Sequence, residues 1–170
     1  MGDFIQFIEN SAVAAWVRES PSIFAYTTVL SLHAMGLAVV VGVGTVVALR
    51  LLGAFKALPV APLLRLFPAM WIGFTVNALS GLLLLAANMS NLLANVMFII
   101  KLVLIAIALV NMELLRHSIT GYAQAGEAQG EISETPRTRA LAASAIVLWI
   151  AVIVAGRLTA YPNFVSALFS

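Results

Sequence analysis

Residues 21–52 read PSIFAYTTVLSLHAMGLAVVVGVGTVVALRLL, and this stretch sets the class of fold to expect. It is almost wholly apolar and longer than the roughly 20 residues that a helix needs to cross about 30 Å of hydrocarbon. Similar stretches follow at about 62–88, 91–116 and 136–161. In lipid only a helix satisfies the backbone groups of a lone segment, and none of the stretches alternates as a barrel strand does. The sequence therefore predicts an all-α protein with four transmembrane helices in an antiparallel bundle.

The composition agrees with a membrane protein. Hydrophobic residues make up 62% of the 170 residues, charged residues make up 9%, and the mean hydropathy is +1.06. The chain contains no cysteine, which excludes disulfides, thiolate metal sites and iron–sulfur clusters within it. Residues 21–170 are expected to form the membrane domain, which leaves no room for a soluble catalytic module. We therefore expect no catalytic activity from this chain on its own, and no nucleic-acid partner.

The first 20 residues differ from the rest of the chain. Asp3 and Glu9 lie where a signal peptide would be basic, so we expect this segment to be retained. Ser20 followed by Pro21 predicts the start of the first span. Apolar and polar side chains of residues 1–20 separate onto two faces, which predicts an amphipathic helix lying in the membrane interface. The apolar face comprises Phe4, Ile5, Ile8, Ala12 and Trp16, and the polar face comprises Asp3, Gln6 and Asn10.

The distribution of lysine and arginine predicts the orientation in a bacterial inner membrane. Basic residues concentrate around the first and third connections, and such residues favour the cytoplasmic side. Both termini are thus expected on the periplasmic side, with the loop 118–135 in the cytoplasm. The basic residues of the cytoplasmic side are Arg50, Lys56, Arg65, Arg116, Arg137 and Arg139, against Arg18 and Arg157 on the other side.

Ionisable and polar residues inside the spans are the candidate functional residues. His33, Asn77 and Lys101 fall within about one helical turn of the centres of their spans, and Arg157 falls about 10 Å further out. No carboxylate lies in the core of any span, so the partner expected for Lys101 is a set of dipoles, water or an anion from outside the chain. His117 is expected near the cytoplasmic surface, in solvent.

Small residues accompany these polar groups. Gly36 and Gly44 share the face of His33, which leaves space beside the imidazole for a partner helix or a flat ligand. On another face of the same helix, Ala34, Ala38 and Gly42 recur every four residues, a spacing that predicts close helix packing. We also expect an ion pair between Arg50 and Glu113 at the cytoplasmic interface.

Several short motifs resemble a bacterial family of small four-helix inner-membrane proteins of unknown function. They are HAMGL (33–37), LRLLG (49–53) and AGRLTAY (155–161), together with Lys101, Asn111 and His117 on the third span. The likeness runs from about Glu19 to Tyr161, and it marks His33, Arg50, Lys101, His117 and Arg157 as family positions. In layout the chain is more distantly similar to the membrane domains of copper-resistance proteins and b-type cytochromes. The latter usually offer paired histidines at one depth, whereas the two histidines here are about 27 Å apart along the membrane normal.

Three functions are compatible with these features. The first is a membrane subunit for electron transfer, in which His33 ligates haem b iron or hydrogen-bonds a quinone. Lys101 and Arg157 would then meet propionates or a quinone oxygen, with Asn77, Gly36 and Gly44 completing the site. The second is an accessory or assembly subunit of a larger membrane complex, and the third is a small solute carrier. We expect membrane lipids and a second copy or other membrane subunits as partners. The candidates for a second axial haem ligand are Lys101, Met35, Met70 and His33 of a second copy.

Overall fold

The computed structural model describes residues 2–55, 57–59, 61–124 and 135–161. All regular secondary structure in these residues is helical. The elements are α1 (Gly2–Glu9), α2 (Ala12–Glu19), α3 (Ile23–Leu51), the 3-10 helix η1 (Ala61–Leu66), α4 (Phe67–Ala87), α5 (Met89–Leu93), α6 (Val96–Gln124) and α7 (Pro136–Leu158). Within α3, η1–α4, α6 and α7 lie four segments long and apolar enough to cross a membrane, which confirms the predicted fold class.

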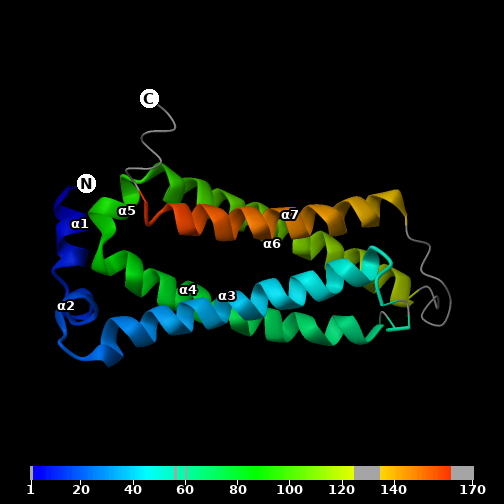
Figure 1. Ribbon diagram of the computed structural model, residues 1–170, viewed down its shortest axis with the longest axis horizontal. Coiled ribbons are helices and arrows are strands. Elements are labelled where there is room, and N and C mark those ends of the chain that lie inside the picture. The colour runs from blue at the N-terminus through cyan, green and yellow to red at the C-terminus, as the bar shows by residue number, and fades with distance from the viewer. Residues whose placement is uncertain (1, 56, 60, 125–134, 162–170) are drawn as a thin grey trace.

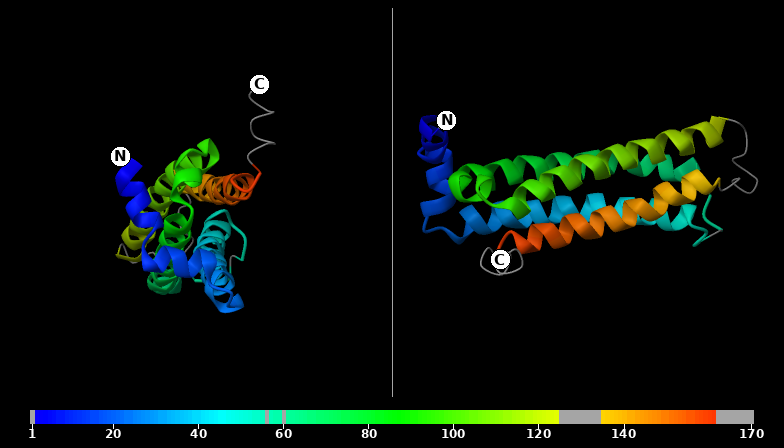
Figure 2. Two further views of the ribbon diagram at one scale, coloured as in Figure 1. Left: turned by 90° about the vertical axis from the view of Figure 1, so that its left-hand side faces the viewer. Right: turned by 90° about the horizontal axis from the view of Figure 1, so that it is seen from above.

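The four long helices form an elongated antiparallel bundle (Figure 1). Helix α3 packs along α4, α6 packs along α7, and α3 also packs against α7, so that the order across the bundle is α4, α3, α7, α6. Helix α6 contacts the first helix pair, α3 and α4 with η1 between them, mainly through η1. The bundle therefore consists of two helix pairs joined through α3 and α7 (Figure 2).

The two ends of the bundle differ in character. Helices α1, α2 and α5 lie across one end, which we call the capped end (Figures 1 and 2). The opposite end, which we call the basic end, carries the described arginines Arg50, Arg65, Arg116, Arg137 and Arg139.

The apolar core is concentrated toward the basic end. Helix α6 shows this most clearly, because the described residues between Met97 and Ala108 include no buried one. The helix pairs are thus packed more tightly toward the basic end than in the half next to the capped end. The fully buried side chains near the basic end include Val47, Leu51, Met112, Leu115 and Ile119.

Helix α3 has a well-defined cap at each end. Its N-cap is Ser22, whose hydroxyl accepts a hydrogen bond from the Phe24 backbone N–H at 3.2 Å, so the prediction of a start at Ser20 was two residues early. At the other end, Gly53 has φ 96° and donates its N–H to the Arg50 carbonyl, while the Ala54 N–H bonds to the Leu49 carbonyl. This is a Schellman motif, and the glycine of LRLLG permits it because only glycine adopts positive φ without strain.

Helix α6 differs from its predicted span at both ends. It begins at Val96 because the Asn95 side chain accepts a hydrogen bond from the Met97 N–H at 3.0 Å, and the segment before it forms the short helix α5. It continues to Gln124, so the prediction that a loop starts at Ser118 was wrong. The extension is held in place by Ile119, which is fully buried in the core. Residues 125–134 of the predicted loop, including Ala125, lie outside the described residues.

The first 20 residues form two short helices rather than one. Ser11 caps α2 by accepting a hydrogen bond from the Ala14 N–H at 3.3 Å, which ends the single helix that the apolar pattern had predicted. Helix α2 buries Ala14 and Val17, and Val17 packs with Val29 of α3 and Ala87 of α4.

Helix α1 is attached to α5 through a carboxylate. Glu9 accepts hydrogen bonds from the Ser90 backbone N–H at 2.7 Å and from the Ser90 hydroxyl at 2.9 Å. These bonds hold the pKa of the Glu9 carboxyl below its ordinary value of 4.5, because both favour the charged form. The carboxylate therefore supplies the acceptor for the first turn of α5.

The small-residue stripe on α3 does not pack within the chain. Ala34, Ala38 and Gly42 are all exposed, and a Cβ at Gly42 would meet no atom within 4 Å. The prediction that this stripe packs closely was wrong for the described chain. Helix α3 approaches its neighbour through another face, which carries Gly36.

Candidate functional site

Helices α3 and α4 approach most closely around two glycines. A Cβ at Gly36 would lie 2.6 Å from the Asn77 backbone nitrogen and 2.7 Å from the Gly73 carbonyl oxygen, and a Cβ at Gly73 would collide with Val39 at 2.7 Å. Glycine at both positions lets the backbones meet, as small residues do in membrane helix pairs. Of the two occupants considered for the space beside Gly36, the structure places a partner helix there.

His33 and Asn77 form a reciprocal pair across this contact. The Asn77 side-chain amide donates to the His33 carbonyl at 2.7 Å, and His33 Nδ1 lies 2.9 Å from the Asn77 carbonyl oxygen. The Ser80 hydroxyl, which donates to the Val76 carbonyl at 2.6 Å, lies 3.4 Å from the same His33 nitrogen. The imidazole also rests against Gly81, where a Cβ would lie 2.9 Å from His33 Cε1.

This contact defines the protonation of the imidazole. A backbone carbonyl can only accept, so Nδ1 must carry the proton and donate it to the Asn77 oxygen. In the neutral ring, Nε2 then holds a lone pair, and it has no hydrogen-bond partner among the described residues. A histidine whose Nδ1–H is bound to a backbone carbonyl has the arrangement that orients metal-ligating and hydrogen-bond-accepting imidazoles.

Lys101 approaches this histidine from the second helix pair. Its side chain lies along α7, because a Cβ at Gly156 would lie 3.5 Å from Lys101 Cε and 3.7 Å from Nζ. The ammonium is near enough to interact electrostatically with the His33 imidazole. Lys101 is the sixth residue of α6, about 8 Å along the helix axis from Val96, so it lies nearer the capped end than its predicted place at the span centre. Both residues are partly buried in the less tightly packed half of the bundle.

Arg157 and Gly44 lie apart from this pair. Arg157 is exposed and donates to the Tyr161 hydroxyl at 2.8 Å, with its guanidinium 5.1 Å from the centre of the tyrosine ring. A Cβ at Gly44 would lie 3.1 Å from Trp149 Nε1, so the space beside this glycine is filled by the indole. The structure thus gathers His33, Asn77, Gly36 and Lys101 in one region.

The other candidate ligands lie apart from the imidazole. Met35 is 61% exposed on α3, and Met70 is buried in the core cluster. The side chain of His117 is 69% exposed, as predicted for a solvated histidine, and it contacts Glu113 at 3.3 Å at the basic end. The described residues contain no group of three or more histidine, cysteine or acidic side chains able to hold a metal ion.

The predicted pair between Arg50 and Glu113 is replaced by other contacts. Among the described residues, Glu113 pairs with Arg116 and His117. Arg50 instead donates from Nε to the Leu58 carbonyl at 2.5 Å, which ties the end of α3 to the connection that follows. A guanidinium one turn away on the same helix competes better for the carboxylate than one on another helix.

Sequence reasoning missed a buried polar cluster between α6 and α7. The Asn111 amide donates to the Ser144 hydroxyl at 2.7 Å, while Asn111 Oδ1 and Trp149 Nε1 are buried with no hydrogen-bond partner in the described part of the chain. The only sequence signal was Asn111 among the family motifs, because Trp149 reads as an ordinary apolar residue.

Comparison of the chain with models of protein families, with curated proteins and with solved structures found no match. The fold and the position of the polar residues therefore define the class of protein by themselves. It is a helical protein with four helices suited to crossing a membrane, and it carries a histidine at the contact of α3 with α4 and a lysine on α6 beside α7.

Proposed function

We propose that this protein is an integral membrane subunit that binds a flat redox-active ligand between its two helix pairs. The observation that carries the proposal is the open Nε2 of His33, whose tautomer is held by the bond from Nδ1–H to the Asn77 carbonyl. Lys101 supports it, since a lysine within electrostatic range of the imidazole supplies a hydrogen-bond donor in the same region as the Nε2 acceptor.

A quinone fits this pair better than haem b within one chain. Nε2 can accept a hydrogen bond from one hydroxyl of the reduced form, the quinol, and the Lys101 ammonium can donate to the other ring oxygen in either redox state. A quinone bound there would supply two-electron, two-proton redox chemistry. Haem b usually takes a second axial ligand. Met35 is exposed and Met70 lies in the core, so that ligand would come from Lys101 or from His33 of a second copy.

The test is to purify the protein in mild detergent, extract it for quinone analysis and record a reduced-minus-oxidised absorption spectrum. We expect co-purified quinone in the wild type and a large loss of it in His33→Gln. His117→Gln is the matched control, because it removes the exposed histidine at the other end of the bundle. Sharp haem bands that His33→Gln abolishes would support the haem form of the proposal. A colourless preparation that holds no quinone, and that binds none when quinone is added, would refute both the quinone and the haem form of the proposal.

A second candidate function is an accessory subunit that docks on another membrane protein. The exposed stripe of Ala34, Ala38 and Gly42 favours it, because small residues at this spacing accept a partner helix closely. Co-purification of a second membrane subunit that Ala38→Leu abolishes, together with an absence of bound redox ligand, would favour this function over the first.

A further inference from the structure

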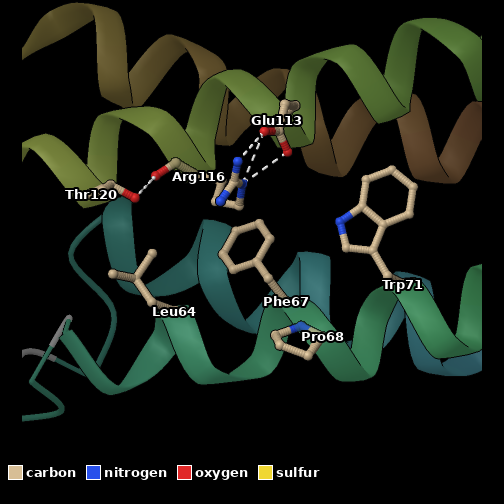
Figure 3. A pocket seen from close by; sticks show the side chains of 7 residues that line it. All are labelled: Leu64, Phe67, Pro68, Trp71, Glu113, Arg116 and Thr120. Carbon is tan, nitrogen blue, oxygen red and sulfur yellow. Dashed lines mark hydrogen bonds and ion pairs between the residues drawn. The ribbon is translucent and has the colours of Figure 1, made fainter.

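A cavity of about 440 Å³ opens at the basic end between the start of α4 and the last third of α6 (Figure 3). It is distant from His33, which lies in the half of α3 nearer the capped end. Its volume is in the range of small-ligand sites. The lining residues are Leu64, Phe67, Pro68, Trp71, Glu113, Arg116 and Thr120.

The two walls of the cavity differ in chemistry. The wall from η1 and α4 is apolar, and most of its side chains contain rings. Phe67 is buried and Trp71 is 41% exposed. The wall from α6 is polar, and Figure 3 shows the side chains of Glu113 and Arg116 between the two helices. An amphipathic molecule is the kind of ligand that meets both walls.

Arg116 is the cationic side chain in the lining of this cavity. Its Nε donates to both carboxylate oxygens of Glu113, at 3.0 and 2.9 Å, and its Nη2 donates to one of them. Its Nη1 has no partner among the described residues, and the side chain is 40% exposed. Glu113 thus orients the guanidinium and leaves one nitrogen for an oxyanion. His117 contacts the same carboxylate at 3.3 Å, so the charge of Glu113 is shared.

The surroundings favour an anionic lipid over a soluble anion. Among the described residues, the lining holds one arginine and one carboxylate, and Arg65 follows Leu64 of the lining in η1 and adds a further positive charge beside the cavity. Exposed apolar side chains continue from the cavity along both helices toward the middle of the bundle. They are Ile72, which follows Trp71 on α4 and is 67% exposed, and Val110, one turn before Glu113 on α6 and 62% exposed. This surface suits an acyl chain.

We propose that the cavity binds an anionic phospholipid of the leaflet that the basic end faces. Its phosphate lies on Arg116 Nη1, and the first part of an acyl chain lies against Trp71 and Phe67. The basic residues of this end select the anionic headgroup, as they do in interhelical basic pockets of membrane proteins.

Fluorescence quenching by brominated lipids tests this proposal. The protein is reconstituted in phosphatidylcholine containing a small, equal fraction of either phosphatidylglycerol or phosphatidylcholine brominated on its acyl chains. The signal of Trp71 is the difference between the wild type and Trp71→Phe, since Trp16 and Trp149 remain in both. We expect phosphatidylglycerol to be enriched at Trp71 by roughly fivefold, the ratio that corresponds to about 1 kcal/mol. Equal quenching by the two lipids in the wild type would overturn the proposal, and this comparison needs no arginine variant.

Two arginine variants locate the effect. Arg116→Gln should remove the preference for phosphatidylglycerol, and Arg157→Gln at the capped end should keep it. An unchanged preference in Arg116→Gln would overturn the role of Arg116. Glycerol phosphate in solution should not relieve the quenching. If glycerol phosphate relieves the quenching of the wild type at concentrations that do not change the quenching of Arg116→Gln, the cavity is a site for soluble anions and the lipid proposal fails.

Discussion

The side chain of His33 bonds to the backbone of Asn77, and the side chain of Asn77 bonds to the backbone of His33. Each side chain thereby donates a hydrogen bond to a backbone carbonyl of the other helix. That carbonyl can also accept the backbone hydrogen bond of its own helix. The pair fixes the register of α3 against α4 at the point where Gly36 and Gly73 let the backbones approach. It also leaves Nε2 of the imidazole open, which links helix packing to the proposed site.

Replacing Asn77 with alanine should weaken this register. The variant loses the 2.7 Å bond to the His33 carbonyl, and interhelical hydrogen bonds in membranes contribute about 1 kcal/mol. For a chain of this length we expect the melting temperature in detergent to fall by about 2–4 °C. Asn91→Ala is the control, because Asn91 is exposed and its side chain bonds, among the described residues, to the nearby Asn88. Equal melting temperatures for the two variants would show that the Asn77 bond contributes little.

Leucine should be tolerated at Ala38 and not at Gly36. A Cβ at Gly36 would lie 2.6 Å from backbone, whereas Ala38 is exposed on the opposite stripe. We expect Gly36→Leu to destabilise the protein by about 1–3 kcal/mol or more and Ala38→Leu to be close to neutral. Thermal denaturation of both variants in the same detergent measures the difference. A larger loss for Ala38→Leu than for Gly36→Leu would contradict the assigned faces of α3.

Attachment of α1 should depend on pH through Glu9. The folded-state pKa of this carboxyl is below 4.5, because Ser90 donates two hydrogen bonds to the charged form. The stabilisation is therefore fully present above the ordinary pKa and is lost as the pH falls through the folded value. Hydrogen exchange of the α5 amides should be slow at neutral pH in the wild type and faster in Glu9→Gln. Asp3→Asn serves as the control acidic residue of α1, and equal exchange in all three proteins at neutral pH would disprove the link.

We predict that the basic end faces the cytoplasm, because lysine and arginine concentrate there. Cysteine labelling can test this in intact cells, since the chain has no cysteine of its own. Asn91→Cys at the capped end should react with a membrane-impermeant reagent, and Gly121→Cys near the basic end should react only after the cells are opened. Both positions are exposed in the structure. Labelling of Gly121→Cys from outside would reverse the topology.

Much of the fold could be predicted because hydrocarbon imposes a simple rule on a chain. A segment such as 21–52 must be helical there, and its length alone shows that it can span the bilayer. The helix ends were less predictable, because caps compete locally. Ser22 rather than Ser20 begins α3, and Asn95 rather than Asn91 begins α6, since the side chain of each accepts a hydrogen bond from a backbone N–H of the first turn.

The candidate site was predicted in part. His33, Asn77 and Lys101 stood out because polar groups in apolar spans are costly, and the structure brings them to one region. Which face of a helix meets a neighbour was not readable, because Gly36 and Ala38 belong to equally small and apolar stripes. The cavity beside Arg116 was also missed, since its walls come from η1, α4 and the far end of α6.

The sequence by itself determined that the chain forms long apolar helices with a few polar groups in them, because these properties depend on local composition and helical period. Only the tertiary structure decided that Gly36 rather than Ala38 lies at the helix contact, that Glu113 pairs with Arg116, and that Nε2 of His33 is left open. These features depend on how each helix is rotated about its axis and how far it is shifted along its neighbour. Both are set by the sum of many small packing contacts across the bundle, which no single stretch of sequence contains.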